Sequence, residues 1–453
     1  MRVSLSTLLL LSTTARALDV TWTDENSVKK TMAEVAKGMT SVYTGNNPGD
    51  VPGNLPDPYY WWEAGAMFGA LIDYWYYTGD EQFNDITTQA MVHQKGDDDD
   101  YMPANQSKSL GNDDQGFWGL SAMAAAENKY PDPKDGPGWL GLAQGVFNTQ
   151  ARRWNGDTCG GGLKWQIFTF NKGFDYKNTI SQGCFFSLAA RLGRYTGNQT
   201  YTDWAEKAWE WTRAIGLISD DYHFYDGTSD QSGQNCTKKD HTQWTYNAGI
   251  FLYGSAVLWN MSAEAGNENN VWRERTEGII KALPVFTQNT GNVITEVACE
   301  KSNTCNIDQR SFKAYLARWM AATTKVAPWT IDTLEPILQA SREAAVKACT
   351  QSGDGNTQCG LQWTTGQFDG KTGVGENMAV LEVMGTALVK NVEGPVSEKT
   401  GGTSKGDPNA GSSSPNTPTH VEPIGAGDKA GAAILTILVL AGTLGGGFWL
   451  IKP

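Results

Sequence analysis

Apolar residues recur through most of the chain at the three- and four-residue spacing that is typical of amphipathic α-helices. This periodicity predicts about a dozen helices, joined by short loops and a few long ones. The alternation of apolar and polar residues that is typical of β-strands forms no convincing series along the chain. One short extended segment is expected at residues 163–168, where such alternation occurs. The predicted helices cover residues 27–43, 59–78, 81–95, 114–129, 139–154, 177–195, 201–216, 242–264, 270–288, 309–326, 331–350 and 375–390.

Three of these helices are predicted to end in the same way. Residues 43–45, 77–79 and 195–197 all read Tyr-Thr-Gly, in which glycine supplies a left-handed C-cap before the next helix begins. Repeated helical hairpins predict a solenoid or a closed ring. With about six hairpins, we expect an all-α fold, an α/α toroid (six-hairpin barrel). Its inner helices should be rich in glycine and aromatic residues, as residues 61–70 are.

The two ends of the chain differ from its middle. Residues 1–17 have the basic start, apolar core and small-residue motif of a secretory signal peptide. Residues 18–393 are expected to form one barrel, and residues 394–429, which are rich in Gly, Ser, Thr and Pro, a flexible stalk. The apolar residues 430–453 predict a glycolipid (GPI) attachment signal. A single transmembrane helix is the alternative, which Lys452 leaves open. The protein is therefore expected to be secreted and held at the cell surface.

Charge and composition narrow the range of partners. The formal net charge of −13 and the pI of about 4.9 argue against nucleic acid and anionic membrane surfaces. Eighteen tryptophans accompany only 19% charged residues. Indole rings bury well, but they also suit the apolar C–H patches of sugar rings.

Seven cysteines in a secreted chain imply disulfides and one unpaired thiol. Cys299 and Cys305 bracket one short loop, and Cys349 and Cys359 bracket another, so each pair is predicted to be bonded. Cys184 lies in an apolar helical stretch and is the expected free thiol, which leaves residues 159 and 236 to pair. None of the spacings resembles a zinc site. Four sequons predict N-glycosylation at Asn105, Asn198, Asn235 and Asn260.

The candidate chemistry lies at residues 111–118, which read GNDDQGFW. Asp113 and Asp114 stand at the predicted start of an apolar helix, among glycines and aromatic rings. Two carboxylates held together repel, so one keeps its proton while the other is ionised. Such a pair suits glycoside cleavage. The alternative is that both are ordinary first-turn acids complementing the helix dipole. This alternative is weakened because Asn112 could already cap the helix, and because the turn that follows is apolar.

Other clusters are weaker candidates. The four aspartates at 97–100 are most simply a solvated loop, as runs of like charge usually are. A calcium site is the alternative, although the spacing is not that of an EF-hand. The four histidines are scattered without ligand spacing, and no nucleophile-elbow motif is present. We therefore expect no metal and no cofactor.

At the paired aspartates the chain resembles glycoside hydrolase family 76, the endo-α-1,6-mannanase family, and within it the fungal GPI-anchored cell-wall proteins of the Dfg/Dcw type. Supporting blocks are residues 61–65 (WWEAG), 161–166 (GGLKWQ), 177–181 (KNTIS), 245–249 (TYNAG) and 312–313 (FK). The predicted substrate-binding residues come from these blocks and from the aromatic neighbours of the pair, although core packing is the alternative for any single tryptophan. They are Trp61, Trp62, Glu63, Trp118, Lys164, Trp165, Asn178, Tyr246, Asn247 and Lys313.

The resemblance implies a six-hairpin α/α barrel and retaining chemistry on α-mannosides. It implies that Asp113 is the nucleophile and Asp114 the general acid/base. It further implies action on the mannose core of GPI glycans, with transfer of GPI-anchored proteins to cell-wall β-glucan. Plain endo-α-1,6-mannanase activity is one alternative, and a noncatalytic sugar-binding wall protein on the same barrel is another.

Overall fold

The computed structural model describes residues 18–231, 233–413 and 426–451, which fall into two separate units. The first unit contains twelve α-helices among the residues described, and each corresponds to a predicted helix. Most helix ends lie within a few residues of the predicted ones. The second unit is the single helix α13 (Ala426–Ile451). The predicted signal peptide, residues 1–17, lies outside the described residues.

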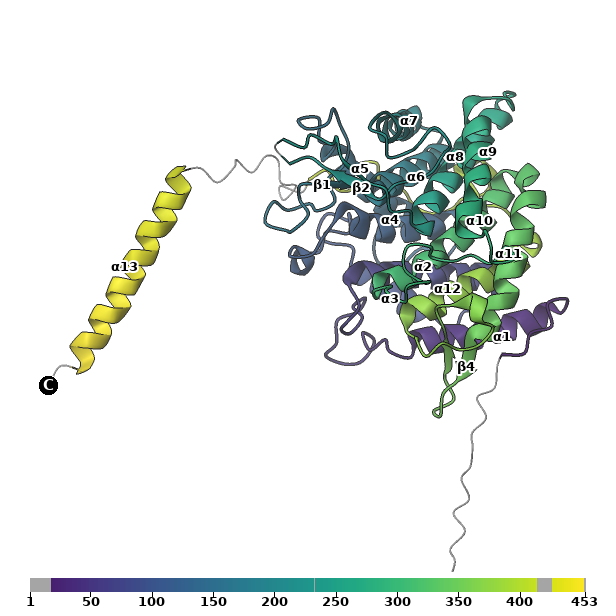
Figure 1. The fold of residues 1–453 in the computed structure, drawn as a ribbon, viewed down its shortest axis with the longest axis horizontal. Helices are drawn as coiled ribbons and strands as arrows, with labels where there is room; N and C mark the ends of the chain where they lie inside the picture. The colour runs from purple at the N-terminus through teal and green to yellow at the C-terminus, as the bar shows by residue number, and fades with distance from the viewer. Residues whose placement is uncertain (1–17, 232, 414–425, 452–453) are drawn as a thin grey trace, which may run out of the picture. The chain divides into compact units, whose positions relative to one another are not determined.

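The helices of the first unit, labelled in Figure 1, form an inner ring and an outer layer that packs against it. Each inner helix contacts the next, and the last contacts the first, so the ring is closed. The inner helices are α2 (Trp61–Thr78), α4 (Asn112–Glu127), α6 (Thr179–Thr196), α8 (Thr245–Glu264), α10 (Phe312–Val326) and α12 (Val374–Gly385). The outer helices are α1 (Glu25–Thr40), α3 (Asn84–His93), α5 (Trp139–Arg152), α7 (Gln199–Ala214), α9 (Val271–Ala282) and α11 (Ile331–Ala345). The predicted α/α toroid is confirmed.

Composition decides which ring a helix joins. The outer helix α1 buries one stripe, with Val28, Met32, Val35 and Met39 at helical spacing, and exposes the rest to solvent. The inner helix α2 is buried on nearly every side. Its Gly65 lets α4 approach closely, because a Cβ there would lie 2.7 Å from the Trp118 ring. Glycine allows this close approach on several inner helices, but it does not define the inner ring, because α5 has two glycines and α10 has none.

The repeated Tyr-Thr-Gly motif has two outcomes. Gly79 and Gly197 adopt left-handed conformations at φ 73° and 71°, and they cap α2 and α6 as predicted. Gly45 does not cap a helix, because α1 already ends at Thr40. Sequence similarity at these three sites therefore predicted two helix ends correctly and one wrongly.

Short strands accompany the helices. β1 (Tyr176–Asn178), β2 (Gly227–Ser229) and β3 (Lys239–Asp240) form an antiparallel sheet in that order, and β4 (Cys349–Gln351) pairs with β5 (Thr357–Cys359). Residues 163–168 form no strand, only an isolated bridge between Gln166 and Gly111. That bridge nevertheless matters, since it joins this segment to the start of α4.

The cysteines pair as the sequence predicted. Cys299 bonds to Cys305, and Cys349 bonds to Cys359, while Cys184 is free and buried. The remaining two cysteines, at positions 159 and 236, also form a disulfide. Three of the predicted glycosylation sites, Asn105, Asn198 and Asn235, are exposed.

Asn260 is only partly exposed, and its Oδ1 accepts a hydrogen bond from Arg194 Nε at 2.9 Å. Glycosylation at all four sites stays a prediction. The surroundings of Asn260 make it the least accessible of the four.

The first part of the expected stalk is wrong, because residues 394–413 pack on the barrel. Val396 and Ala410 are buried, and the Val396 N–H donates to the Glu127 carbonyl at 2.9 Å. Asp132 accepts from Ser404 Oγ at 2.7 Å. The segment is held mainly by polar contacts, which a composition-based argument about apolar burial does not detect. The rest of the expected stalk lies largely outside the described residues.

The helix α13 spans most of the predicted attachment signal and exposes Ile434, Leu435 and Leu438. Among the residues that the structure describes, no helix is both long and apolar enough to cross a membrane. The GPI signal stays a prediction.

Candidate active site

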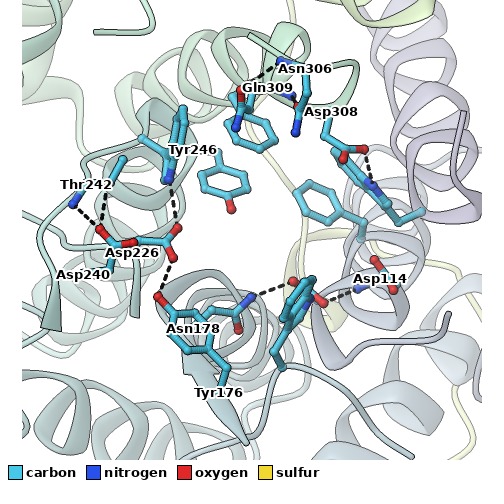
Figure 2. Close-up of a pocket in the computed structure, with 16 residues that line it drawn as sticks. Asp114, Tyr176, Asn178, Asp226, Asp240, Thr242, Tyr246, Asn306, Asp308 and Gln309 are labelled. Carbon is cyan, nitrogen blue, oxygen red and sulfur yellow. Dashed lines mark hydrogen bonds between the residues drawn. The ribbon is translucent and has the colours of Figure 1, made fainter. Parts of the chain in front are cut away.

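The inner helices all begin at the same end of the barrel, and a cavity of about 360 Å³ lies there (Figure 2). Its lining comes from the first turns of these helices and from the loops before them. The lining residues are Trp62, Asp113, Asp114, Phe117, Trp165, Tyr176, Asn178, Asp226, Asp240, Thr242, Trp244, Tyr246, Asn306, Asp308, Gln309 and Phe312. Because helix N-termini carry partial positive charge, this end of the barrel favours acidic side chains.

The paired aspartates are fixed by hydrogen bonds at the start of α4. Gly111, rather than Asn112, is the N-cap residue, and its N–H donates to Asp114 Oδ2 at 2.6 Å. Asn178 Nδ2 donates to Asp113 Oδ2 at 2.8 Å, and the Asp114 N–H donates to Asp113 Oδ1 at 3.1 Å. Asp114 therefore makes the capping contact expected of an ordinary acid in the first turn of a helix. Both carboxylates nevertheless also line the cavity.

The two carboxyl groups are separated in acidity. Burial raises the pKa of Asp113 to about 7, against the opposing effect of the hydrogen bond from Asn178. Burial and the neighbouring charge of Asp113 raise the pKa of Asp114 well above its usual range. Asp113 is thus the group that ionises first, while Asp114 keeps its proton. An ionised carboxylate is suited to act as a nucleophile, and a protonated carboxyl group is suited to act as an acid.

Three further aspartates line the cavity and were missed by the sequence analysis, namely Asp226, Asp240 and Asp308. Figure 2 shows Asp226 and Asp308 on opposite sides of the cavity. Trp244 Nε1 donates to Asp226 Oδ1 at 2.9 Å, and Trp62 Nε1 donates to Asp308 Oδ1 at 3.1 Å. Burial raises the pKa of both Asp226 and Asp308. Their common signal is position, since both precede an inner helix by less than twenty residues.

The rest of the cavity wall is aromatic. Seven of the sixteen lining residues are Trp, Tyr or Phe, and none is Lys or Arg. Tyr246 and Phe312 stack with ring centroids 3.9 Å apart, and Trp62 lies 4.8 Å from Phe117. Aromatic faces beside carboxylates suit a neutral polyol with apolar C–H patches, that is, a sugar.

Four of the ten predicted substrate-binding residues line the cavity, namely Trp62, Trp165, Asn178 and Tyr246. Trp61 and Trp118 do not, since both are buried in the core with their rings stacked at 5.0 Å. Their indole N–H groups are used internally, Trp118 Nε1 to the Trp61 carbonyl and Trp61 Nε1 to Gln94. On a helix buried all round, neighbouring residues face different directions, so adjacency to the site did not place these two rings in it.

The other four predicted contacts do not line the cavity either. Lys313 is buried and pairs with Glu300 at 2.8 Å, and Lys164 pairs with Asp230 at 2.5 Å. Glu63 and Asn247 are fully buried, and their side chains have no hydrogen-bond partner among the residues described. Glu63 and Asn247 each come directly after a residue that lines the cavity. Burial, together with the charges of Asp308 and Glu376, raises the pKa of Glu63 well above its usual range.

No group of three or more potential ligands capable of holding a metal ion occurs among the described residues. The four aspartates at 97–100 are not simply a solvated loop. Asp100 is buried and accepts from the Met102 N–H at 3.1 Å, while Lys95 pairs with Asp99 at 2.5 Å. This loop also contacts the C-terminal segment, where the Gly411 N–H donates to the carbonyl oxygen of residue 98 at 2.8 Å. Its role is structural.

Comparisons with known proteins identify the family. The family described as glycosyl hydrolase family 76 matches residues 27–399. The mannan endo-1,6-alpha-mannosidase DCW1 of Saccharomyces cerevisiae is 44% identical over 440 residues, which cover 96% of this chain and 95% of that protein. The mannan endo-1,6-alpha-mannosidase DFG5 of the same yeast is 41% identical over 441 residues, covering 96% and 94%.

Solved structures give the same result. The crystal structure of Dfg5 from Chaetomium thermophilum in complex with glucosamine is 43% identical, has a TM-score of 0.81, and covers 86% of this chain and 97% of its own. An inactive variant of the α-1,6-mannanase GH76A of Salegentibacter sp. HEL1_6, in complex with α-1,6-mannotriose, is 17% identical with a TM-score of 0.62, covering 80% and 99%. This second likeness concerns the fold alone. With the family match and the close yeast relatives, it follows that the chain belongs to glycosyl hydrolase family 76.

Proposed function

We propose that this glycoside hydrolase acts on α-mannosides with retention of configuration, and that transfer to a sugar acceptor outweighs hydrolysis. One observation carries the reaction type: Asp113 and Asp114 lie together in an aromatic cavity and are separated in acidity. Retaining glycosidases need one ionised carboxylate and one protonated carboxyl group at the scissile bond.

The proposed cycle uses each group twice. Asp114 donates its proton to the glycosidic oxygen while Asp113 attacks the anomeric carbon, so the bond to the leaving sugar breaks and a glycosyl ester forms. Asp114, now ionised, then takes the proton of an incoming hydroxyl group, whose oxygen displaces Asp113. Water at this step gives hydrolysis, and a sugar hydroxyl gives transfer.

The substrate assignment rests on the relatives, several of which are named mannan endo-1,6-alpha-mannosidases. We propose the mannose core of GPI glycans as the donor and cell-wall β-glucan as the acceptor. The predicted signal peptide and attachment signal support a secreted, GPI-anchored enzyme at the plasma membrane and cell wall. Such tethering raises the effective concentration of donors in the same plane.

The test is product analysis with an α-1,6-mannooligosaccharide and a GPI glycan as donors, with and without a soluble β-glucan oligosaccharide. We expect Asp113→Asn to abolish turnover of every donor, and Asp114→Asn to lose roughly 10²- to 10⁴-fold. Asp114→Asn should keep part of its rate on an aryl mannoside with a good leaving group, which needs no acid. Asp135→Asn, at an exposed site, is the matched control.

If only water-quenched mannosides form at every acceptor concentration, the transferase proposal is wrong and plain endo-α-1,6-mannanase replaces it. Near-normal turnover by either pair mutant would remove the assignment of Asp113 and Asp114. Sugar binding without any turnover would favour the noncatalytic wall protein.

A further inference from the structure

The loop between Trp165 and Tyr176 carries two stacked rings, and the outer one is exposed to solvent. Both ends of this loop line the cavity. Between them, Phe170 is 69% exposed, more than any other large apolar residue described in the barrel. It stacks on Phe168 with centroids 5.3 Å apart and an interplanar angle of 18°. A single exposed apolar side chain needs no explanation. A stacked pair on a loop that also forms the cavity wall is a different case.

This loop is tied to the catalytic helix. The Asn112 N–H donates to the Trp165 carbonyl at 2.8 Å, and the Trp165 N–H donates to the Tyr176 carbonyl at 2.6 Å. Near the tip, Asn171 Nδ2 donates to the Ser107 carbonyl and to Gln166 Oε1, each at 3.1 Å. The stacked rings are therefore held in place relative to the paired aspartates.

The chemistry of this surface fits an uncharged sugar strand. Phe168 is half-buried against the core and supports Phe170 from behind, so one planar face is presented. The residues beside the ring, Thr169 and Asn171, are polar and uncharged. A β-linked glucose ring carries all its hydroxyl groups equatorially and exposes apolar C–H faces, whereas the axial 2-hydroxyl of mannose interrupts one face. Aromatic rings bind such C–H faces well.

We propose that Phe170, backed by Phe168, is the platform on which the β-glucan acceptor lies beside the cavity. The proposal rests on the transferase function proposed above. In the transfer step, a hydroxyl group of the platform-bound strand gives its proton to Asp114 and forms the new C–O bond, while the ester bond to Asp113 breaks. Water that reaches the same ester competes with this strand.

The experiment compares wild type with Phe170→Ala, Phe170→Leu and Phe170→Trp, using the complete enzyme, a GPI-glycan donor and a laminari-oligosaccharide acceptor. Transfer product, hydrolysed donor and direct binding of the laminari-oligosaccharide are measured separately. Val271→Ala is the matched control, because Val271 is 45% exposed at the start of α9, at the barrel end where the inner helices finish.

We expect Phe170→Ala to raise the acceptor concentration needed for half-maximal transfer roughly tenfold and to weaken laminari-oligosaccharide binding equally. Phe170→Leu should behave like Phe170→Ala, because leucine is apolar but not planar. Phe170→Trp should retain transfer. The control variant should match wild type.

The outcomes separate the platform from the transferase function. Transfer that is unchanged in Phe170→Ala overturns the platform and leaves the function standing. Phe170-dependent binding of laminari-oligosaccharide without any transfer product overturns the function and supports the platform. Phe170-dependent binding to phosphatidylcholine vesicles, with no effect on laminari-oligosaccharide, would instead identify a membrane contact and overturn the platform.

Discussion

Asn178 is the residue that adjusts the ionisation of the proposed nucleophile. Its Nδ2 donates to Asp113 Oδ2, which stabilises the ionised form and lowers the pKa of Asp113. With the pKa of Asp113 at about 7, activity should fall as the pH drops through this value, because the nucleophile becomes protonated. The alkaline limit should lie higher, where Asp114 loses its proton.

We therefore predict that Asn178→Ala moves the acid limb of kcat/KM to higher pH by about one to two units, since a hydrogen bond to a charged group contributes about 1.5–3 kcal/mol. Asn306→Ala is the control, because Asn306 also lines the cavity but bonds to Gln309. A pH profile for Asn178→Ala that coincides with wild type would show that this contact does not set the ionisation of Asp113.

Gly111 matters because of the space it leaves. A Cβ at this position would lie 2.4 Å from Asp113 Oδ1 and 3.1 Å from Asp114 Oδ2. We predict that Gly111→Ala displaces both carboxylates and lowers kcat by roughly 10²-fold or more, while the fold survives. Gly156→Ala is the matched control, because a Cβ there meets nothing within 4 Å. Turnover in Gly111→Ala equal to that of the control would contradict this geometry.

At the scale of elements, β1 depends on a buried lysine. Lys177 Nζ donates to the carbonyls of Thr158 at 2.8 Å and Gly161 at 2.5 Å, and to Asn155 Oδ1 at 3.1 Å. It thereby fastens the loop before residue 162 to the strand that carries Asn178. The lysine side chain is fully buried, so an apolar replacement removes the donor of all these acceptors at once.

We predict that Lys177→Met lowers the free energy of unfolding by about 2–5 kcal/mol, through unsatisfied buried carbonyls. Lys238→Met, at an exposed position, should stay within about 0.5 kcal/mol of wild type. Chemical denaturation followed by circular dichroism measures both variants. Equal stability of the two would mean that water replaces the lysine in this cage.

The elements also show what the sequence can predict. All twelve barrel helices follow from apolar periodicity, because each buries a stripe or a whole surface over ten or more residues. The strands of two or three residues are too short to leave a pattern. Asp113 and Asp114 were identifiable as neighbours in the chain, whereas Asp226 and Asp308 reach the cavity only through closure of the ring. Trp61 and Trp118 were misplaced because sequence does not tell which way a ring on a buried helix faces.

At the scale of the whole molecule, residues 394–413 run over the outside of the barrel and bond to several of its helices. Pro395 and Val396 meet the ends of two inner helices, where carbonyl groups lack partners within the helix, and residues 404–413 bond to α5 and to the 97–100 loop. Val396 N–H satisfies the carbonyl of Glu127, the last residue of α4, and Arg194 Nη1 near the end of α6 donates to the Pro395 carbonyl at 2.9 Å. The segment thus acts as part of the fold.

We predict that a secreted chain of residues 18–393 melts lower than one of residues 18–413 by on the order of 5 °C. Removing the segment exposes the sites of Val396 and Ala410 and leaves Gln144 Oε1 without the 2.7 Å bond from the Asp407 N–H. Differential scanning calorimetry of the two chains decides the point, with mannoside turnover at 25 °C as a check that the cavity is intact. The chain of residues 18–413 should melt with the full-length protein. Equal melting temperatures of the two shorter chains would support the flexible stalk that the composition predicted, because residues 394–413 would then contribute nothing to the stability of the barrel.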